Sequence, residues 1–309
     1  MTKRVLIVFM AIVLFQGVVI KAKDEVKKEV PKKIVKLMKK GLKYLVKANK
    51  AIEQEKKDEF IKDAIEKYNE VLKIDNKYAP AYFQLALINN TKKDFNSTVE
   101  CLEKTISADA THIKAKTLLA LLYYEQGRAF QQKKNLKKAL EYMEKFVDMP
   151  IAKEKMNDKY SITLYIMGYI HSNFKNYKVA NECFKKHIEM FKDKKKTETY
   201  YFAVYMVGIN IYTDMESLII KNNLTKNIKK LKGFISNYPD VEKYLEITVK
   251  APMAKWTESA CFSLLKYYIY KGDKAKAKAM AEELIEKYPQ SNDLGIYKGL
   301  LKNQISKMK

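Results

Sequence analysis

The sequence predicts an all-α protein, and three observations point to that fold class. The 309 residues include only 9 Gly and 6 Pro, against roughly 22 and 15 at average usage, and folds with many strands and tight turns need both. Apolar residues make up 47% of the chain, which is enough to bury a core. Apolar positions also recur at helical spacing in segments of similar length, so we expect a series of amphipathic helix pairs.

The N-terminus has the residue order of a secretory signal peptide. Residues 1–4 form a short basic stretch, and residues 5–15 carry no polar side chain. The small residue Ala22 then precedes a run of charged residues. We expect residues 1–22 to be a signal peptide removed on export, or a membrane anchor, followed by a charged linker over 23–32. As an anchor, the apolar residues 5–20 are shorter than the roughly 20 residues that span a bilayer comfortably. A buried first helix is the third alternative. The export signal predicts a periplasmic or secreted protein.

A repeated unit is clearest over residues 79–112. Tyr82, Leu85 and Ala86 share one face of a first helix, and the apolar positions around Leu102 share one face of a second. This unit resembles a tetratricopeptide repeat (TPR), whose first helix carries an aromatic residue, Leu-Gly and Tyr, and whose second carries Ala, an aromatic residue and a closing Pro. The positions that depart from the pattern are Asn89, Thr98 and Thr105.

The same pattern recurs over residues 33–309, which we expect to form one TPR-like α-solenoid. The expected units are about 33–78, 79–112, 113–151, 161–194, 201–240 and 258–291, followed by a C-terminal capping helix over 292–309. Residues 270–289 (YKGDKAKAKAMAEELIEKYP) are the most family-like segment. An insertion around 214–224 is either an extended helix or an edge loop. The resemblance implies a right-handed superhelix of about six helix pairs.

The prolines agree with these helix boundaries, because proline lacks the backbone N–H and fixes φ. Those at or before expected helix starts are Pro31, Pro80 and Pro252, and those just past expected helix ends are Pro150, Pro239 and Pro289. None of the six falls inside an expected helix.

The chain is strongly basic, with 60 Lys+Arg against 36 Asp+Glu and a formal net charge of +24. Such a field favours acidic partners, anionic lipid or nucleic acid. Only Arg4 and Arg128 are arginine, and lysine lacks the planar fork that grips phosphates and bases bidentately, so a nucleic-acid partner is not expected. The lysines form either a solvated surface or a functional basic patch.

The sequence predicts no catalytic chemistry, cofactor or metal site. It contains no Gly-rich phosphate loop, zinc-type Cys pair, two-His metal helix or nucleophile elbow. We therefore expect that the chain is not an enzyme. His171 and His187 are expected to face each other across one helix pair, either as a packed pair or as two metal ligands. Cys101, Cys183 and Cys261 are far apart in the sequence and are expected to fill gaps in helix packing.

The resemblance implies a ligand-facing surface along the first helix of each unit. Some family members place Lys and Asn there to clamp C-terminal carboxylates, whereas this sequence carries aromatic residues, so we expect no such clamp. Tyr offers a large contact area at low entropic cost. The alternative is that the rings pack helix against helix. The predicted partner-binding residues are Phe83, Leu87, Tyr124, Tyr165, Tyr169, Phe202, Tyr205, Tyr212, Phe262 and Tyr270.

Together these features predict a non-catalytic scaffold or adaptor of the cell envelope that binds a partner peptide or helix in an aromatic-lined concave groove. The alternative is a small-ligand-binding accessory protein, for example a TPR partner of a solute transporter, which would need an enclosed apolar pocket. We expect a protein or peptide partner, acidic if the basic surface takes part. Membrane contact is expected only through an uncleaved N-terminal segment.

Overall fold

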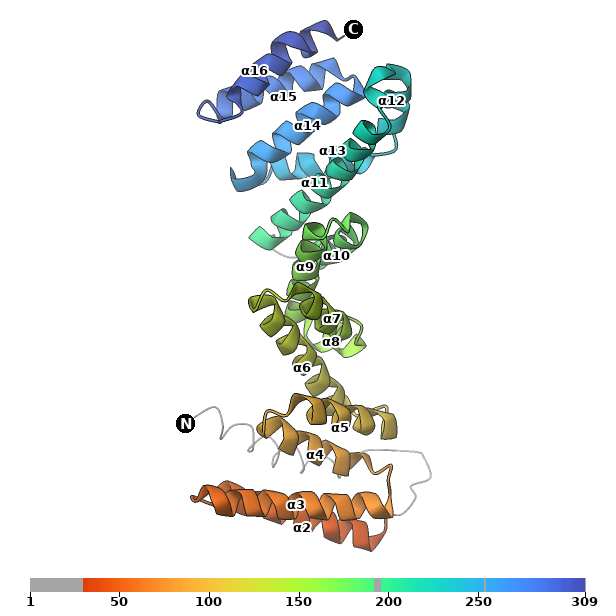
Figure 1. Cartoon of the computed structure of the whole chain (residues 1–309), viewed down its shortest axis with the longest axis vertical. Coiled ribbons are helices and arrows are strands. Elements are labelled where there is room, and N and C mark those ends of the chain that lie inside the picture. Colours follow the sequence, from red (N-terminus) through yellow and green to blue (C-terminus); the bar gives the residue numbers. More distant parts are fainter. Residues whose placement is uncertain (1–29, 192–195, 253, 309) are drawn as a thin grey trace. The chain divides into compact units, whose positions relative to one another are not determined.

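The computed structural model describes residues 30–191, 196–252 and 254–308, and within these ranges it contains fifteen α-helices and no strand (Figure 1). The expected all-α solenoid of helix pairs is confirmed. The predicted signal peptide or anchor of residues 1–22 lies outside the described residues, and the first described helix, α2, begins at Lys32. None of the described helices is long and apolar enough to cross a membrane.

The helices divide into two compact units. Unit 1 comprises the described residues up to Gln126 together with Asp148–Lys155. Unit 2 comprises Gly127–Val147 and the described residues from Met156 onward. Helix α6 (Ile113–Gln132) contributes residues to both units.

Unit 1 is built from helix pairs with an apolar seam between their members. Its helices, besides part of α6, are α2 (Lys32–Lys50), α3 (Gln54–Ile74), α4 (Ala79–Thr91), α5 (Phe95–Ala108) and α8 (Pro150–Lys155). Helix α2 packs on α3, α4 packs on α5, and α3 also contacts α4. Ile34 of α2 and Tyr68 of α3 are buried in the shared core.

Unit 2 continues the same arrangement. Its helices, besides part of α6, are α7 (Leu136–Val147), α9 (Asn157–Asn173), α10 (Tyr177–Glu189), α11 (Glu198–Lys221), α12 (Ile228–Ile235), α13 (Pro239–Val249), α14 (Thr257–Lys271), α15 (Lys274–Lys287) and α16 (Leu294–Asn303). The pairs are α9 with α10, α11 with α13, and α14 with α15; α10 also packs on α11, and α13 on α14. Helix α16 packs on α15 and closes the last pair.

Local sequence sets the tight turn between α14 and α15. Gly272 ends α14 with a φ of 80°, a left-handed conformation that costs glycine little. Asp273 then caps α15, because its side chain accepts a hydrogen bond from the Lys276 backbone N–H at 3.1 Å. The two helices can therefore follow each other with almost no linker.

A close approach between the helices of one pair depends on glycine. A Cβ added to Gly168 of α9 would lie 2.8–2.9 Å from three ring atoms of Phe184 on α10. Phe184 is fully buried. Any larger residue at position 168 would therefore push a packed ring out of place.

Two prolines begin helices that the sequence analysis did not predict. Pro150 and Pro239 do lie past the ends of α7 and α12, but Pro150 is also the first residue of α8 and Pro239 the first of α13. The first helical position suits proline, because its missing N–H would be unpaired there anyway. The fifth pair differs accordingly, since the main partner of α11 is α13, whereas α12, the helix of the 228–235 segment, packs on α14. The insertion at 214–224 is largely an extended helix, because α11 continues to Lys221.

Candidate functional site: an aromatic face in unit 2

The first helices of successive pairs in unit 2 lie next to one another, since α11 contacts both α9 and α14. Tyr165 and Tyr169 stand one turn apart on α9, and Phe202 and Tyr205 stand one turn apart on α11. Trp256 ends the 3-10 turn η2 (Ala254–Trp256), directly before α14. We call these five residues the aromatic face.

The rings of the aromatic face form one connected set. Phe202 is at its centre, with ring centroids 5.6 Å from Tyr165, 6.3 Å from Tyr169 and 5.0 Å from Trp256. Tyr205 stacks on Trp256 at 6.2 Å with an interplanar angle of 14°. These separations lie within the range in which aromatic pairs attract. Four of the ten predicted partner-binding residues are thus brought together.

The aromatic face packs on a buried ring and is partly exposed to solvent. Phe184 lies under it, with its fully buried ring 6.3 Å from Tyr165 and 6.4 Å from Phe202. Tyr169 is 47% exposed, and the other four rings are partly buried. Burial raises the pKa of the Tyr165 hydroxyl above its ordinary value. The Tyr205 hydroxyl lies 2.9 Å from the Ser259 hydroxyl, and the arrangement offers an apolar surface that is partly open to solvent.

Trp256 was missed by the sequence analysis. It is the one Trp of the chain, but it lies on a 3-10 turn ahead of the helix, outside the repeat positions that the family resemblance supplies. The signal that could have found it is the rarity of Trp beside the start of a unit, since Trp is enriched at interfaces.

Two other predicted residues use their hydroxyl groups inside unit 2. Tyr212 and Tyr270 donate hydrogen bonds to Glu216 Oε1 at 2.5 and 3.2 Å, and Lys266 Nζ lies 3.1 Å from the same oxygen. Burial alone would raise the pKa of Glu216, but these hydrogen bonds outweigh it and the pKa is lowered. These three donors are therefore already paired with Glu216 and are not available to a partner. Phe262 packs on Tyr297, 5.3 Å between centroids, under the Lys266 ammonium.

The remaining predicted residues belong to unit 1. Phe83 is buried and its ring lies 4.6 Å from that of His112, so it packs helix against loop. Leu87 and Tyr124 are partly buried. The alternative prediction, that the rings serve packing, therefore describes Phe83 and Tyr212, whereas Tyr169 is open to solvent.

Unit 1 also holds an apolar hollow of about 710 Å³ between α5, α6 and α8. It is open to solvent on one side. The apolar residues that line it are Ile106, Ile113, Leu119, Tyr123, Met149, Pro150 and Ile151.

The two histidines of the α9–α10 pair do not meet, contrary to the sequence-based expectation. His187 Nδ1 lies 2.9 Å from both the carbonyl oxygen and the hydroxyl of Ser161, near the start of α9. His171 is about 15 Å farther along the same helix at 1.5 Å per residue. Burial lowers the pKa of both imidazoles. In the described part of the chain, no three His, Cys, Asp or Glu side chains are grouped to hold a metal.

The buried thiols are expected to be unreactive. Cys183 and Cys261 lie in helix seams, and burial raises their pKa to about 11 and about 12. A thiol needs its thiolate form to react. These two cysteines therefore serve packing, as predicted from their wide spacing.

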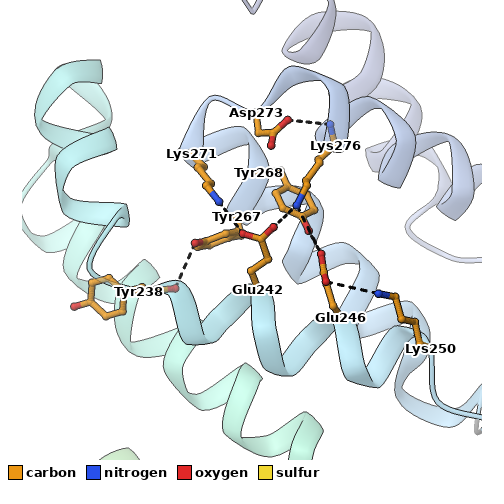
Figure 2. Close-up of polar contacts among 9 residues, drawn as sticks. All are labelled: Tyr238, Glu242, Glu246, Lys250, Tyr267, Tyr268, Lys271, Asp273 and Lys276. Atoms are coloured by element: carbon orange, nitrogen blue, oxygen red, sulfur yellow. Dashed lines mark hydrogen bonds and ion pairs between the residues drawn. The ribbon is translucent and has the colours of Figure 1, made fainter.

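A polar network joins α13, α14 and α15 at the C-terminal end of unit 2 (Figure 2). Glu242 of α13 pairs with Lys271 at 2.7 Å and with Lys276. Tyr268 donates a hydrogen bond to Glu246 at 3.0 Å. Burial would raise the pKa of Glu242, but the hydrogen bonds from its two lysines outweigh that and lower it. The lysines of this surface are therefore engaged in holding helices together.

Comparison with known proteins identifies the repeat. Residues 79–112 and 120–150 match one tetratricopeptide repeat model, and residues 266–291 match another. These three segments of the chain match tetratricopeptide repeats. The aromatic face lies on helices outside the TPR segments matched by these models. No curated protein sequence is significantly similar to the chain.

Several solved structures are weakly similar to the chain. PilF of Pseudomonas aeruginosa is 14% identical, with 87% of this chain and 97% of that chain covered at a TM-score of 0.39. YrrB, described as a TPR protein with an unusual peptide-binding site, is 15% identical, with 75% and 96% covered at 0.38. PilW, a type IV pilus biogenesis factor, is 12% identical, with 86% and 99% covered at 0.33. The likeness concerns the kind of fold alone.

Proposed function

We propose that the chain is a non-catalytic interaction scaffold of the cell envelope that binds an extended peptide or a partner helix across the aromatic face of unit 2. The TPR segments support a protein–protein interaction scaffold, since repeats of this kind present extended binding surfaces. The envelope location rests on the residue order of the N-terminus, which is typical of an export signal.

The observation that carries the proposal is the connected set of rings from successive first helices. Tyr169 is nearly half exposed in this set, and Phe202, Tyr205 and Trp256 contact one another beside it. Aromatic side chains that are already held by neighbours lose little entropy on binding, and they dominate the energy of many interfaces. A partner would bury the rings and hydrogen bond to the tyrosine hydroxyls.

The small-ligand alternative has less support. The hollow of unit 1 is large enough for a small molecule, at about 710 Å³. It is open to solvent, however, and sites for small ligands usually bury most of the ligand surface. An open apolar hollow suits a side chain of a partner better than a free metabolite.

The proposal is tested with peptides selected against the full chain from a random library. The Tyr169→Ala/Tyr205→Ala variant should bind the selected peptides several hundred-fold more weakly than the wild type, because aromatic anchors typically contribute about 2 kcal/mol each when truncated. The matched control is Phe174→Ala, because Phe174 is also 47% exposed in unit 2 and lies outside the aromatic face. An equal loss in both variants, or no loss in the double variant, would contradict the proposal.

A further inference from the structure

Helix α2 differs from the other helices in its charge. It contains eight lysines and no Asp or Glu. All eight lysine side chains are exposed. They are Lys32, Lys33, Lys36, Lys39, Lys40, Lys43, Lys47 and Lys50.

The eight lysines lie on one face. At 100° per residue their directions fall within an arc of about 120°, and the helix that carries them is about 28 Å long. The opposite face, with Ile34, Leu37 and Met38, is buried against α3. We call this row of eight residues the lysine stripe.

Some exposed lysines on other helices have an acidic partner on the same helix. Lys104 pairs with Glu100 on α5, and Lys287 pairs with Glu283 on α15, each one turn away. Among the described residues the lysine stripe makes no ion pair, and Lys47 instead lies over the ring of Phe60 at 5.3 Å.

Among the described residues, no acidic side chain of the neighbouring helix forms an ion pair with the stripe. On α3, Glu66 and Glu70 both lie within ion-pair distance of Lys67. The hydrogen bond from Lys67 is the main reason that the pKa of Glu70 is lowered, and the charge of Lys40 adds to the effect. The like charges of the stripe therefore repel one another in the free protein, and an anionic surface would relieve that repulsion.

We propose that the lysine stripe docks the chain on an anionic lipid surface, with α2 lying parallel to the membrane plane. A straight row of lysines about 28 Å long can bring all its charges close to a plane at once. Val35, which is 39% exposed, and the partly buried Leu42 and Val46 follow one side of the stripe. Basic residues beside apolar ones are typical of helices that lie in the membrane interface.

Lipid fits the stripe better than the other anionic partners. Helix α2 contains no arginine, so it lacks the bidentate donors that grip individual phosphates and bases. Clusters of four to eight basic residues bind acidic headgroups through their summed charge, and point charges suffice for that. The stripe also follows residues 5–20, whose apolar side chains suit a bilayer.

The test compares three versions of the full chain on vesicles of phosphatidylcholine with and without phosphatidylglycerol. The stripe variant carries Lys32→Gln, Lys36→Gln, Lys39→Gln and Lys43→Gln. Gln keeps nearly the helix propensity of Lys. The control variant loses the same total charge from exposed lysines elsewhere, at Lys226, Lys229, Lys298 and Lys302. Residues 5–20 are common to all three versions, so their own affinity for bilayers cancels.

The stripe variant should bind the anionic vesicles several hundred-fold more weakly than the wild type, since each lysine near an anionic surface contributes about fivefold. The control variant should bind within about tenfold of the wild type. Phosphatidylglycerol vesicles should also protect the α2 lysines, but not Lys226 or Lys298, from an amine-reactive reagent. Circular dichroism of each variant establishes that it is folded.

Three results would overturn the proposal. One is equal binding of the wild type to neutral and anionic vesicles, and another is an equal loss in the stripe and control variants. The third is stripe-dependent binding to polyglutamate or to single-stranded DNA without binding to anionic vesicles, which would assign the stripe to a protein or nucleic-acid partner.

Discussion

Replacing Gly168 with Ala tests how closely α9 and α10 approach under the aromatic face. Ala is favoured over Gly inside a helix by about 1 kcal/mol. Here its Cβ would lie 2.8–2.9 Å from three atoms of the Phe184 ring, which is fully buried and cannot retreat. Overpacking of this kind costs about 1–3 kcal/mol, so we expect a net loss of about 1 kcal/mol in the free energy of unfolding.

The sign of the effect should reverse when the ring is removed. In a Phe184→Val background, which lacks all three contacting ring atoms, Gly168→Ala should stabilise the protein by about 0.5–1 kcal/mol. Gly299→Ala is the matched control, because Gly299 lies inside α16 with no heavy atom within 4 Å of an added Cβ. Urea unfolding followed by circular dichroism measures each change. The reasoning fails if Gly168→Ala stabilises the wild type as much as Gly299→Ala does.

Three further predictions concern polar and titratable groups. Glu242→Gln should lower the free energy of unfolding by about 1 kcal/mol at pH 7, because it removes the negative charge that pairs with two lysines at a site that is only 18% exposed. In urea titrations this difference should shrink as the pH falls through the lowered pKa of Glu242, because protonation removes the same charge. The pKa of His187 is lowered in the folded state, so the unfolded chain binds a proton at this imidazole more readily than the folded chain does. The free energy of unfolding should therefore fall between pH 7 and pH 5. In His187→Gln this fall should be shallower. Cys183 and Cys261 should react with a disulfide reagent only at the rate of unfolding, and fast labelling of the native protein would refute their burial.

Sequence periodicity predicted the helices, and the family resemblance predicted much of the aromatic face. The ligand-facing positions that the resemblance implies included Tyr165 and Tyr169, and Phe202 and Tyr205, and the structure places each pair one turn apart on one helix. These predictions depend on the spacing of residues along one helix, which can be read directly from the sequence.

The errors concern relations between elements. Trp256 was missed because a 3-10 turn shifts it out of the repeat count. The pairing of His171 with His187 was wrong because neighbouring helices set which residues lie opposite, and His187 faces Ser161 instead. The role of Glu216 was also missed, because two of its three donors, Lys266 and Tyr270, come from a helix about 50 residues farther along the chain.

The most direct test of the proposed function uses the fluorescence of Trp256, the one Trp of the chain. A Trp-free selected peptide, titrated into the full chain, should shift the Trp256 emission and shield it from a neutral quencher with the same affinity that a direct binding assay gives. The affinity should change little between about 0.01 M and about 0.1 M salt, because apolar burial is not screened. Binding that leaves Trp256 emission and quenching unchanged, or that weakens steeply with salt, would contradict the assignment of the aromatic face as the binding surface.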